Sequence, residues 1–76
     1  METSDLREIL SGREFQVMVL VANGLQNKEV ANELKCGSKT IKKHLQNIFP
    51  KLKVHNRTEA TLKFLKLTGM ILVKAP

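Results

Sequence analysis

A chain of 76 residues has room for one small hydrophobic core, so we expect a single domain. The absence of Trp and Tyr leaves three Phe as the large aromatic residues, which predicts a mainly aliphatic core. One cysteine excludes an internal disulfide, no signal-peptide pattern opens the sequence, and the longest apolar run, six residues from Val17 to Ala22, is too short to span a membrane. We therefore expect a cytoplasmic protein.

The net charge of +6 is unevenly distributed along the chain. Three basic and six acidic residues give residues 1–34 a net charge of −3. Eight lysines and Arg57 against Glu59 alone give residues 35–66 a net charge of +8. A positive region of this kind is typical of a protein that binds a polyanion.

Short segments with helical periodicity, without a strand pattern or an internal repeat, predict an all-α fold of four helices. Residues 1–10 are expected to form a frayed tail or a short leading turn, and residues 1–9 are assigned to a flexible tail. Ser11 is a good N-cap with Glu14 three residues later, as in a capping box, so the first helix should start here and run to Gly24. The side chains expected to face inward are Val17, Met18 and Val21.

The next two helices are short and close together in the sequence. Asn27 is expected to cap a helix over residues 28–34, and a third helix is expected over about residues 39–52. A tight turn separates them, in which either Gly37 or Ser38 can cap the third helix. Two helices joined by a short turn that contains glycine predict a helix-turn-helix motif.

The third helix has two opposite faces when its residues are placed about 100° apart around the axis. One stripe is apolar and consists of Ile41, Leu45, Ile48 and Leu52. The opposite side is polar and consists of Lys39, Lys42, Lys43, Gln46 and Lys53, with Asn47 at its edge. The apolar stripe should pack on the first two helices, which leaves the polar side chains outside, where lysine and glutamine can bond to purine edges in the major groove of DNA.

Pro50 lies inside this third segment. Proline lacks a backbone N–H and its ring collides with the carbonyl four residues earlier. We therefore expect a kink or an early helix end near Phe49.

The last helix is expected to start near Arg57, with Asn56 as its cap, and to stop near Gly69. One side carries Ala60, Phe64 and Leu67. Leu62 and Leu65 lie almost opposite, which we interpret as a subunit interface, because an exposed apolar patch on a small domain usually marks an association surface. The alternative is that residues 1–10 cover this stripe.

Several short motifs occur in order along the chain: Leu10-Ser11-Gly12-Arg13-Glu14, Ala22-Asn23-Gly24, Asn27-Lys28-Glu29-Val30-Ala31, Thr40-Ile41-Lys42-Lys43-His44, Ile48, Lys51-Leu52 and Asn56-Arg57-Thr58-Glu59-Ala60. Together and at this spacing they strongly resemble the LuxR/GerE-type DNA-binding domain of bacterial transcription regulators. The resemblance implies a four-helix domain over residues 10–70, with a tail over residues 71–76. It also implies a central helix-turn-helix, a homodimer formed through the last helix, and binding to half-sites in double-stranded promoter DNA. RNA polymerase is a further candidate partner.

The resemblance also assigns roles to individual residues. The family's base-reading positions correspond to Lys42, Lys43, Gln46 and Asn47. Its phosphate-binding positions correspond to Asn27, Lys28, Lys39, Thr40 and Lys51. Cys36 and Gly37 depart from the common pattern of an apolar residue followed by a serine cap, which leaves the start of the third helix open by one residue.

Catalytic and metal-binding chemistry finds little support in the sequence. No Asp or Glu occurs between Cys36 and Glu59, and no nucleophile, base and orienting group cluster, so we expect no enzyme activity, metal or cofactor. Cys36 is interpreted as a small buried hydrophobic residue, His44 as a packing or phosphate-proximal residue and His55 as a polar loop residue.

The function predicted from the sequence is therefore sequence-specific DNA binding that regulates transcription. The main alternative is a protein-interaction adaptor that sequesters another regulator, in which the lysines of the third helix would be dispensable. An RNA-binding module is disfavoured by the lack of exposed aromatic residues for base stacking.

Overall fold

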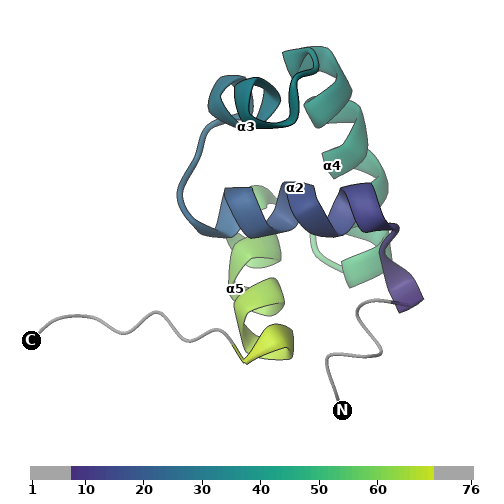
Figure 1. Ribbon diagram of the computed structural model, residues 1–76. Coiled ribbons are helices and arrows are strands. Elements are labelled where there is room, and N and C mark those ends of the chain that lie inside the picture. Colours follow the sequence, from purple (N-terminus) through teal and green to yellow (C-terminus); the bar gives the residue numbers. More distant parts are fainter. Residues whose placement is uncertain (1–7, 70–76) are drawn as a thin grey trace, which may run out of the picture.

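The computed structural model of the chain describes residues 8–69, so the expected C-terminal tail and residues 1–7 of the expected N-terminal tail lie outside the described residues. Four helices are named in this part of the chain: α2 (Gly12–Ala22), α3 (Asn27–Leu34), α4 (Ser38–Leu52) and α5 (Arg57–Thr68). In Figure 1, α2 crosses the middle of the molecule, with α3 and the first half of α4 on one side and α5 on the other. Residues 8–69 contain no strand, and the expected all-α fold is confirmed.

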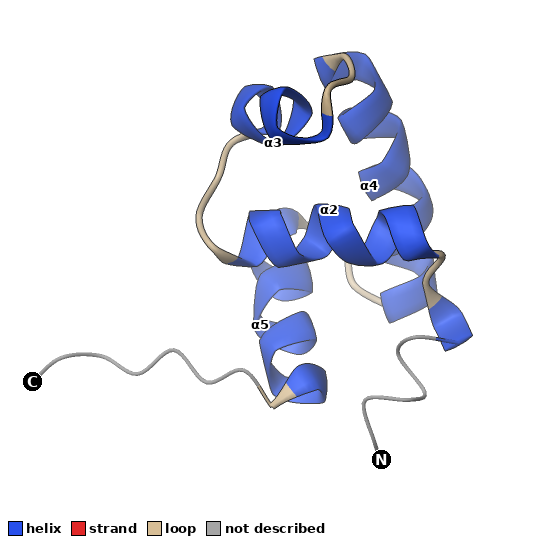
Figure 2. Cartoon of the chain, in the orientation of Figure 1, coloured by secondary structure: helices blue, strands red, loops and turns tan. Residues whose placement is uncertain are grey.

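Some of the helix ends coincide with local signals that are visible in the sequence, and short loops join the helices (Figure 2). Ser11 caps α2, since its Oγ accepts from the Glu14 N–H at 3.1 Å and its own N–H donates to Glu14 Oε1 at 2.9 Å. The predicted capping box is therefore confirmed. The last helical residue is Ala22, two residues before Gly24, and Gly24 follows in the turn with a φ of +92°, the positive φ with which a glycine ends a helix.

The N-cap of α3 is Gln26 and not Asn27 as expected. The Gln26 N–H donates to Glu29 Oε1 at 2.7 Å, which satisfies a donor at the start of the helix. Asn27 is the first residue within the helix, and its side-chain oxygen is bonded elsewhere, to Arg57. The sequence favoured Asn27 because asparagine is a stronger capping residue than glutamine.

Of the two candidate caps of α4, Gly37 is the N-cap, and Ser38 is the first helical residue. The expectation of an early end near Phe49 is wrong, because the helix continues through Pro50 to Leu52. Pro50 lies in the last turn, where its missing N–H removes one bond close to the end of the helix. The Val54 N–H then bonds to the Phe49 carbonyl at 3.0 Å and closes the helix.

The bounds of α5 agree with the sequence prediction. Asn56 is the cap, because its Oδ1 accepts from the Glu59 N–H at 2.9 Å, and Gly69 ends the helix with a φ of +73°. The expectation that Leu62 and Leu65 share an exposed face is wrong for Leu65. Leu62 is 62% exposed, whereas Leu65 is 8% exposed and belongs to the core.

The core is mainly aliphatic, as expected, and draws on all four helices. Val17, Met18 and Val21 are buried, which confirms the predicted inner face of α2. Phe64 is fully buried and meets the half-buried Phe15 of α2 edge to face, with ring centroids 5.2 Å apart. Within residues 8–69, none of the helices has the length and apolar character needed to cross a membrane.

Candidate nucleic-acid interface

The two faces of α4 differ as the sequence predicted. The apolar stripe is buried, with exposures of 0% for Ile41, 6% for Leu45, 0% for Ile48 and 2% for Leu52. The polar side chains on the opposite side are exposed: Lys39, Lys42, Lys43, Gln46 and Asn47. Burial of the stripe therefore fixes which way the cationic side faces.

The arrangement of α3 and α4 is that of a helix-turn-helix. In Figure 1, the two helices meet at the top of the molecule through a tight turn, and α4 then passes one end of α2. Lys35 adopts a left-handed conformation with a φ of 57°, and the Cys36 N–H bonds to the Ala31 carbonyl at 2.9 Å. This turn ends α3 within one residue and allows α4 to start at Ser38 in a new direction.

A shallow depression on α4 brings several of the expected contact residues together. It is lined by Lys39, Thr40, Lys43, His44 and Asn47. Two ammonium groups, a hydroxyl, an imidazole and an amide are groups that donate hydrogen bonds to phosphate oxygens. Lys42 and Gln46 lie on the same exposed side but outside this depression, farther around the helix.

Two of the other three expected phosphate-binding residues lie at the start of α3. Lys28 is exposed, whereas Asn27 is half-buried and its Oδ1 accepts from Arg57 Nη1 at 2.6 Å. Arg57 Nη2 also donates to the Leu25 carbonyl at 2.7 Å. Sequence reasoning missed this role of Arg57, because the partners are 30 and 32 residues away and no local pattern links them.

Lys51 occupies a different position from the other expected phosphate-binding residues. Its Nζ lies 2.8 Å from Glu14 Oε1, and this ion pair joins the last turn of α4 to the first turn of α2. The Lys51 side chain is 40% exposed and that of Glu14 is 8% exposed. A phosphate would therefore share this ammonium group with an internal carboxylate, which already neutralises part of its charge.

The surroundings of Glu14 stabilise its charged form. Burial raises the pKa of the carboxyl group, but the hydrogen bonds from Lys51 and from the Ser11 N–H and the nearby Lys51 and His44 side chains outweigh burial. The pKa of Glu14 is therefore lowered below its ordinary value. The sequence revealed the capping role of Glu14 but not its long-range partner.

The cysteine and the two histidines are the remaining residues that were considered for a site. Cys36 is half-buried against the core, so it is less buried than expected, and His44 is half-buried beside the apolar stripe. His55 is exposed in the loop before α5, with its Nδ1 3.5 Å from Glu59 Oε1. Across residues 8–69, no group of three or more His, Cys, Asp or Glu side chains is placed to hold a metal ion.

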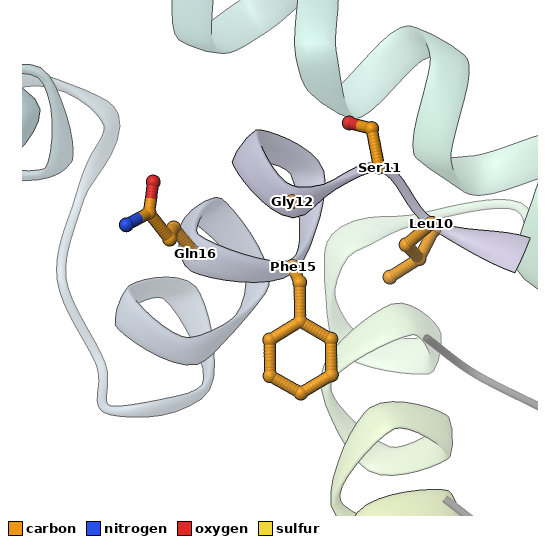
Figure 3. Close-up of a pocket in the computed structure, with 5 residues that line it drawn as sticks. All are labelled: Leu10, Ser11, Gly12, Phe15 and Gln16. Carbon is orange, nitrogen blue, oxygen red and sulfur yellow. The ribbon is translucent and has the colours of Figure 1, made fainter. Parts of the chain in front are cut away.

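A second hollow lies at the start of α2 and is shown in Figure 3. It is lined by Leu10, Ser11, Gly12, Phe15 and Gln16. Its polar side chains have partners on their own helix, because Ser11 Oγ accepts from Glu14 and Gln16 Oε1 accepts from Arg13 at 3.3 Å. The close-up shows no polar groups converging on one point, so the hollow lacks the features of a ligand site.

The comparison with known proteins identifies the family. The family model described as bacterial regulatory proteins, luxR family, matches residues 8–64. The chain belongs to the luxR family. This luxR-family domain is similar to the response regulator protein VraR of Staphylococcus saprophyticus, with 38% identity over 61 residues that cover 80% of the chain and 29% of that relative.

The same luxR-family domain resembles the VraR proteins of two other staphylococci. Identity is 39% over 59 residues for Staphylococcus aureus and for Staphylococcus epidermidis, covering 78% of the chain and 28% of each relative. The chain thus spans less than a third of the length of these relatives. No solved structure matches it. Membership of this family makes the molecule a helix-turn-helix domain of DNA-binding transcription regulators.

Proposed function

We propose that this domain binds promoter DNA sequence-specifically by placing α4 in the major groove. One observation supports the proposal above all: the side of α4 opposite its buried stripe is exposed, rich in lysine and free of acidic residues. The major groove of B-DNA accommodates one α-helix, and lysine and glutamine donate to purine edges there. Binding of this kind next to a promoter would regulate transcription.

The proposed contacts with DNA fall into two groups. Base edges are contacted by Lys42, Lys43, Gln46 and Asn47. Phosphates are contacted by Asn27, Lys28, Lys39 and Thr40. Phosphate contacts position the domain, and base contacts supply the specificity. Lys51 would join the second group with the donors of its ammonium group that do not face Glu14.

We further propose that the domain acts as a homodimer through α5. Leu62 is exposed and borders a shallow depression lined by residues from the end of α2 and the start of α5. An exposed leucine beside an apolar hollow is a suitable self-complementary contact. A two-fold pair would place its two α4 helices about one turn of DNA apart, roughly 34 Å. Bound to a promoter in the cytoplasm, this dimer would be positioned to contact RNA polymerase.

Alanine substitution of Lys42 and Lys43 tests the DNA-binding proposal. The matched control replaces Lys63 and Lys66, two exposed lysines of α5, so that both double variants lose the same charge. Duplexes selected from random sequences serve as the ligand, and the dissociation constant is measured at several salt concentrations. We expect the α4 variant to lose at least about tenfold in affinity and the α5 variant to bind nearly as the parent does.

Two outcomes of this experiment would contradict the proposal. Equal affinities of the two double variants would favour the adaptor hypothesis, in which Lys42 and Lys43 are dispensable. Parent affinity that does not change between dilute and physiological salt would exclude binding through phosphate contacts, because release of counterions makes such binding weaken steeply with salt.

A further inference from the structure

Arg57, the first residue of α5, connects the last helix to the start of α3. Its Nη1 donates to Asn27 Oδ1 at 2.6 Å, and its Nη2 donates to the Leu25 carbonyl at 2.7 Å. The guanidinium group is a planar, rigid fork, so two bonds to separate acceptors fix the positions of both. A half-buried side chain thus joins three elements: α5, the α2–α3 loop and α3.

The bond from Arg57 also determines how the amide of Asn27 is oriented. A guanidinium group has donors and no acceptor, so the amide atom that faces it must be the oxygen. The amide nitrogen of Asn27 is consequently turned away from Arg57. Within residues 8–69 this nitrogen has no hydrogen-bond partner, which leaves two N–H donors for a molecule outside the chain.

We propose that Arg57 is a positioning residue for DNA binding, which holds the Asn27 amide with its N–H groups directed at a phosphate. This inference rests on the proposed function, which assigns Asn27 to a phosphate contact. A side chain that is already held in its bound orientation loses less conformational entropy on binding. Lys28, which is next in the sequence and exposed, supplies charge at the same place, while Asn27 supplies a directed bond.

A double-mutant cycle in DNA affinity tests the inference. The variants are Arg57→Gln, Asn27→Ala and the two combined, measured on the selected duplex together with the free energy of unfolding of each variant. We expect each single substitution to lower the affinity of the folded protein about tenfold, and the combination to lower it by no more than either alone. Lys28→Ala is the control, since its effect should multiply with that of Arg57→Gln.

Arg57→Lys separates position from charge. Lysine keeps the positive charge but lacks the fork that bonds Asn27 and Leu25 together. We expect this variant to bind DNA more weakly than the parent with an unchanged dependence of affinity on salt. Arg57→Lys also replaces Arg57→Gln in the double-mutant cycle if Arg57→Gln does not fold. Its effect on DNA affinity should likewise vanish when Asn27 is alanine.

The outcomes separate this inference from the proposed function. A combined loss of about a hundredfold, the product of two single losses of about tenfold, would overturn the role of Arg57. So would an Arg57 variant that is less stable but binds with parental affinity when folded. If the Lys42 and Lys43 double variant also binds as the parent does, the proposed function itself fails. If that variant loses binding while the cycle is additive, only the role of Arg57 is excluded.

Discussion

Glu14 is the one buried charged side chain among residues 8–69. It accepts the Ser11 N–H at 2.9 Å and the Lys51 ammonium at 2.8 Å through the same oxygen, Oε1. A buried carboxylate is tolerated in a protein only when it is paired and hydrogen-bonded, and here both conditions are met. The residue thus caps α2 and attaches the last turn of α4 to it.

The lowered pKa of Glu14 predicts how stability depends on pH. Because the folded pKa is below the unfolded value of about 4.3, the stabilising effect is complete above that value and is lost as the pH falls through the folded pKa. We expect Glu14→Gln to reduce the free energy of unfolding by about 1–2 kcal/mol at neutral pH. The difference between parent and variant should shrink towards pH 3, as measured by urea denaturation.

Glu33→Gln provides the matched control for this prediction. Glu33 is exposed on α3, so its replacement should leave the free energy of unfolding nearly unchanged at every pH. A Glu14→Gln difference that stays constant between pH 7 and about pH 3 would show that the charge of Glu14 is not the source of its effect.

Sequence distance decided which residue contacts could be predicted. The bonds between Ser11 and Glu14 span three residues, and the capping pattern revealed them in advance. The pair of Glu14 with Lys51 spans 37 residues, and that of Arg57 with Asn27 spans 30. Such contacts arise from how the helices pack, and no spacing rule within one helix contains that information.

Two of the helices end in a lysine that adopts a left-handed conformation. Lys35 after α3 has a φ of 57°, and Lys53 after α4 has a φ of 59°. Glycine usually occupies this position, because a Cβ atom is crowded there by the following carbonyl group. Each lysine complements the negative end of its helix, yet the backbone at these two sites remains strained.

Glycine at either position should relieve this strain. We expect Lys35→Gly and Lys53→Gly each to raise the free energy of unfolding by up to about 1 kcal/mol, which corresponds to a rise of several degrees in the melting temperature. Circular dichroism during heating measures the change.

Gly24→Ala is the converse test of the same effect. Gly24 has a φ of +92°, and no atom lies within 4 Å of the place where a Cβ would sit. Any destabilisation by alanine would therefore come from the backbone conformation, and we expect about 1 kcal/mol. A neutral Gly24→Ala together with destabilising glycine variants would contradict this account.

The helices were predictable to different degrees for a physical reason. In α4 the apolar residues form one stripe, so the buried side and the cationic side followed directly from the pattern. In α5 the apolar residues are spread around the axis, and the pattern could not show that Leu65 is buried while Leu62 is exposed. The end of α4 was misjudged because the effect of Pro50 depends on its distance from the helix end.

At the scale of the whole molecule, Leu62 is the exposed apolar side chain that remains on α5 once Leu65 is assigned to the core. Substitution of Leu62 should therefore affect the association of two chains, and substitution of Leu65 should affect the folding of one chain. A surface leucine contributes little to the stability of a monomer, whereas a buried leucine contributes by the area and volume that it fills.

We expect Leu62→Ser to lower the fraction of dimer at a given concentration with little change in the free energy of unfolding of the monomer. Leu65→Ala should instead lower that free energy by about 2–4 kcal/mol. Sedimentation equilibrium measures the first effect, and chemical denaturation measures the second. A Leu62→Ser protein that sediments as the parent does would exclude Leu62 from a subunit contact.

The complete absence of Asp and Glu from α4 has a consequence for how the domain would find its target. With no like charge to repel a backbone phosphate, the proposed DNA-binding surface would attract any duplex, whatever its bases. Most encounters would then be with the wrong stretch of chromosome, and the protein would travel along it by sliding and short hops. Retention on heparin and contamination with host nucleic acid during purification should follow from the same property.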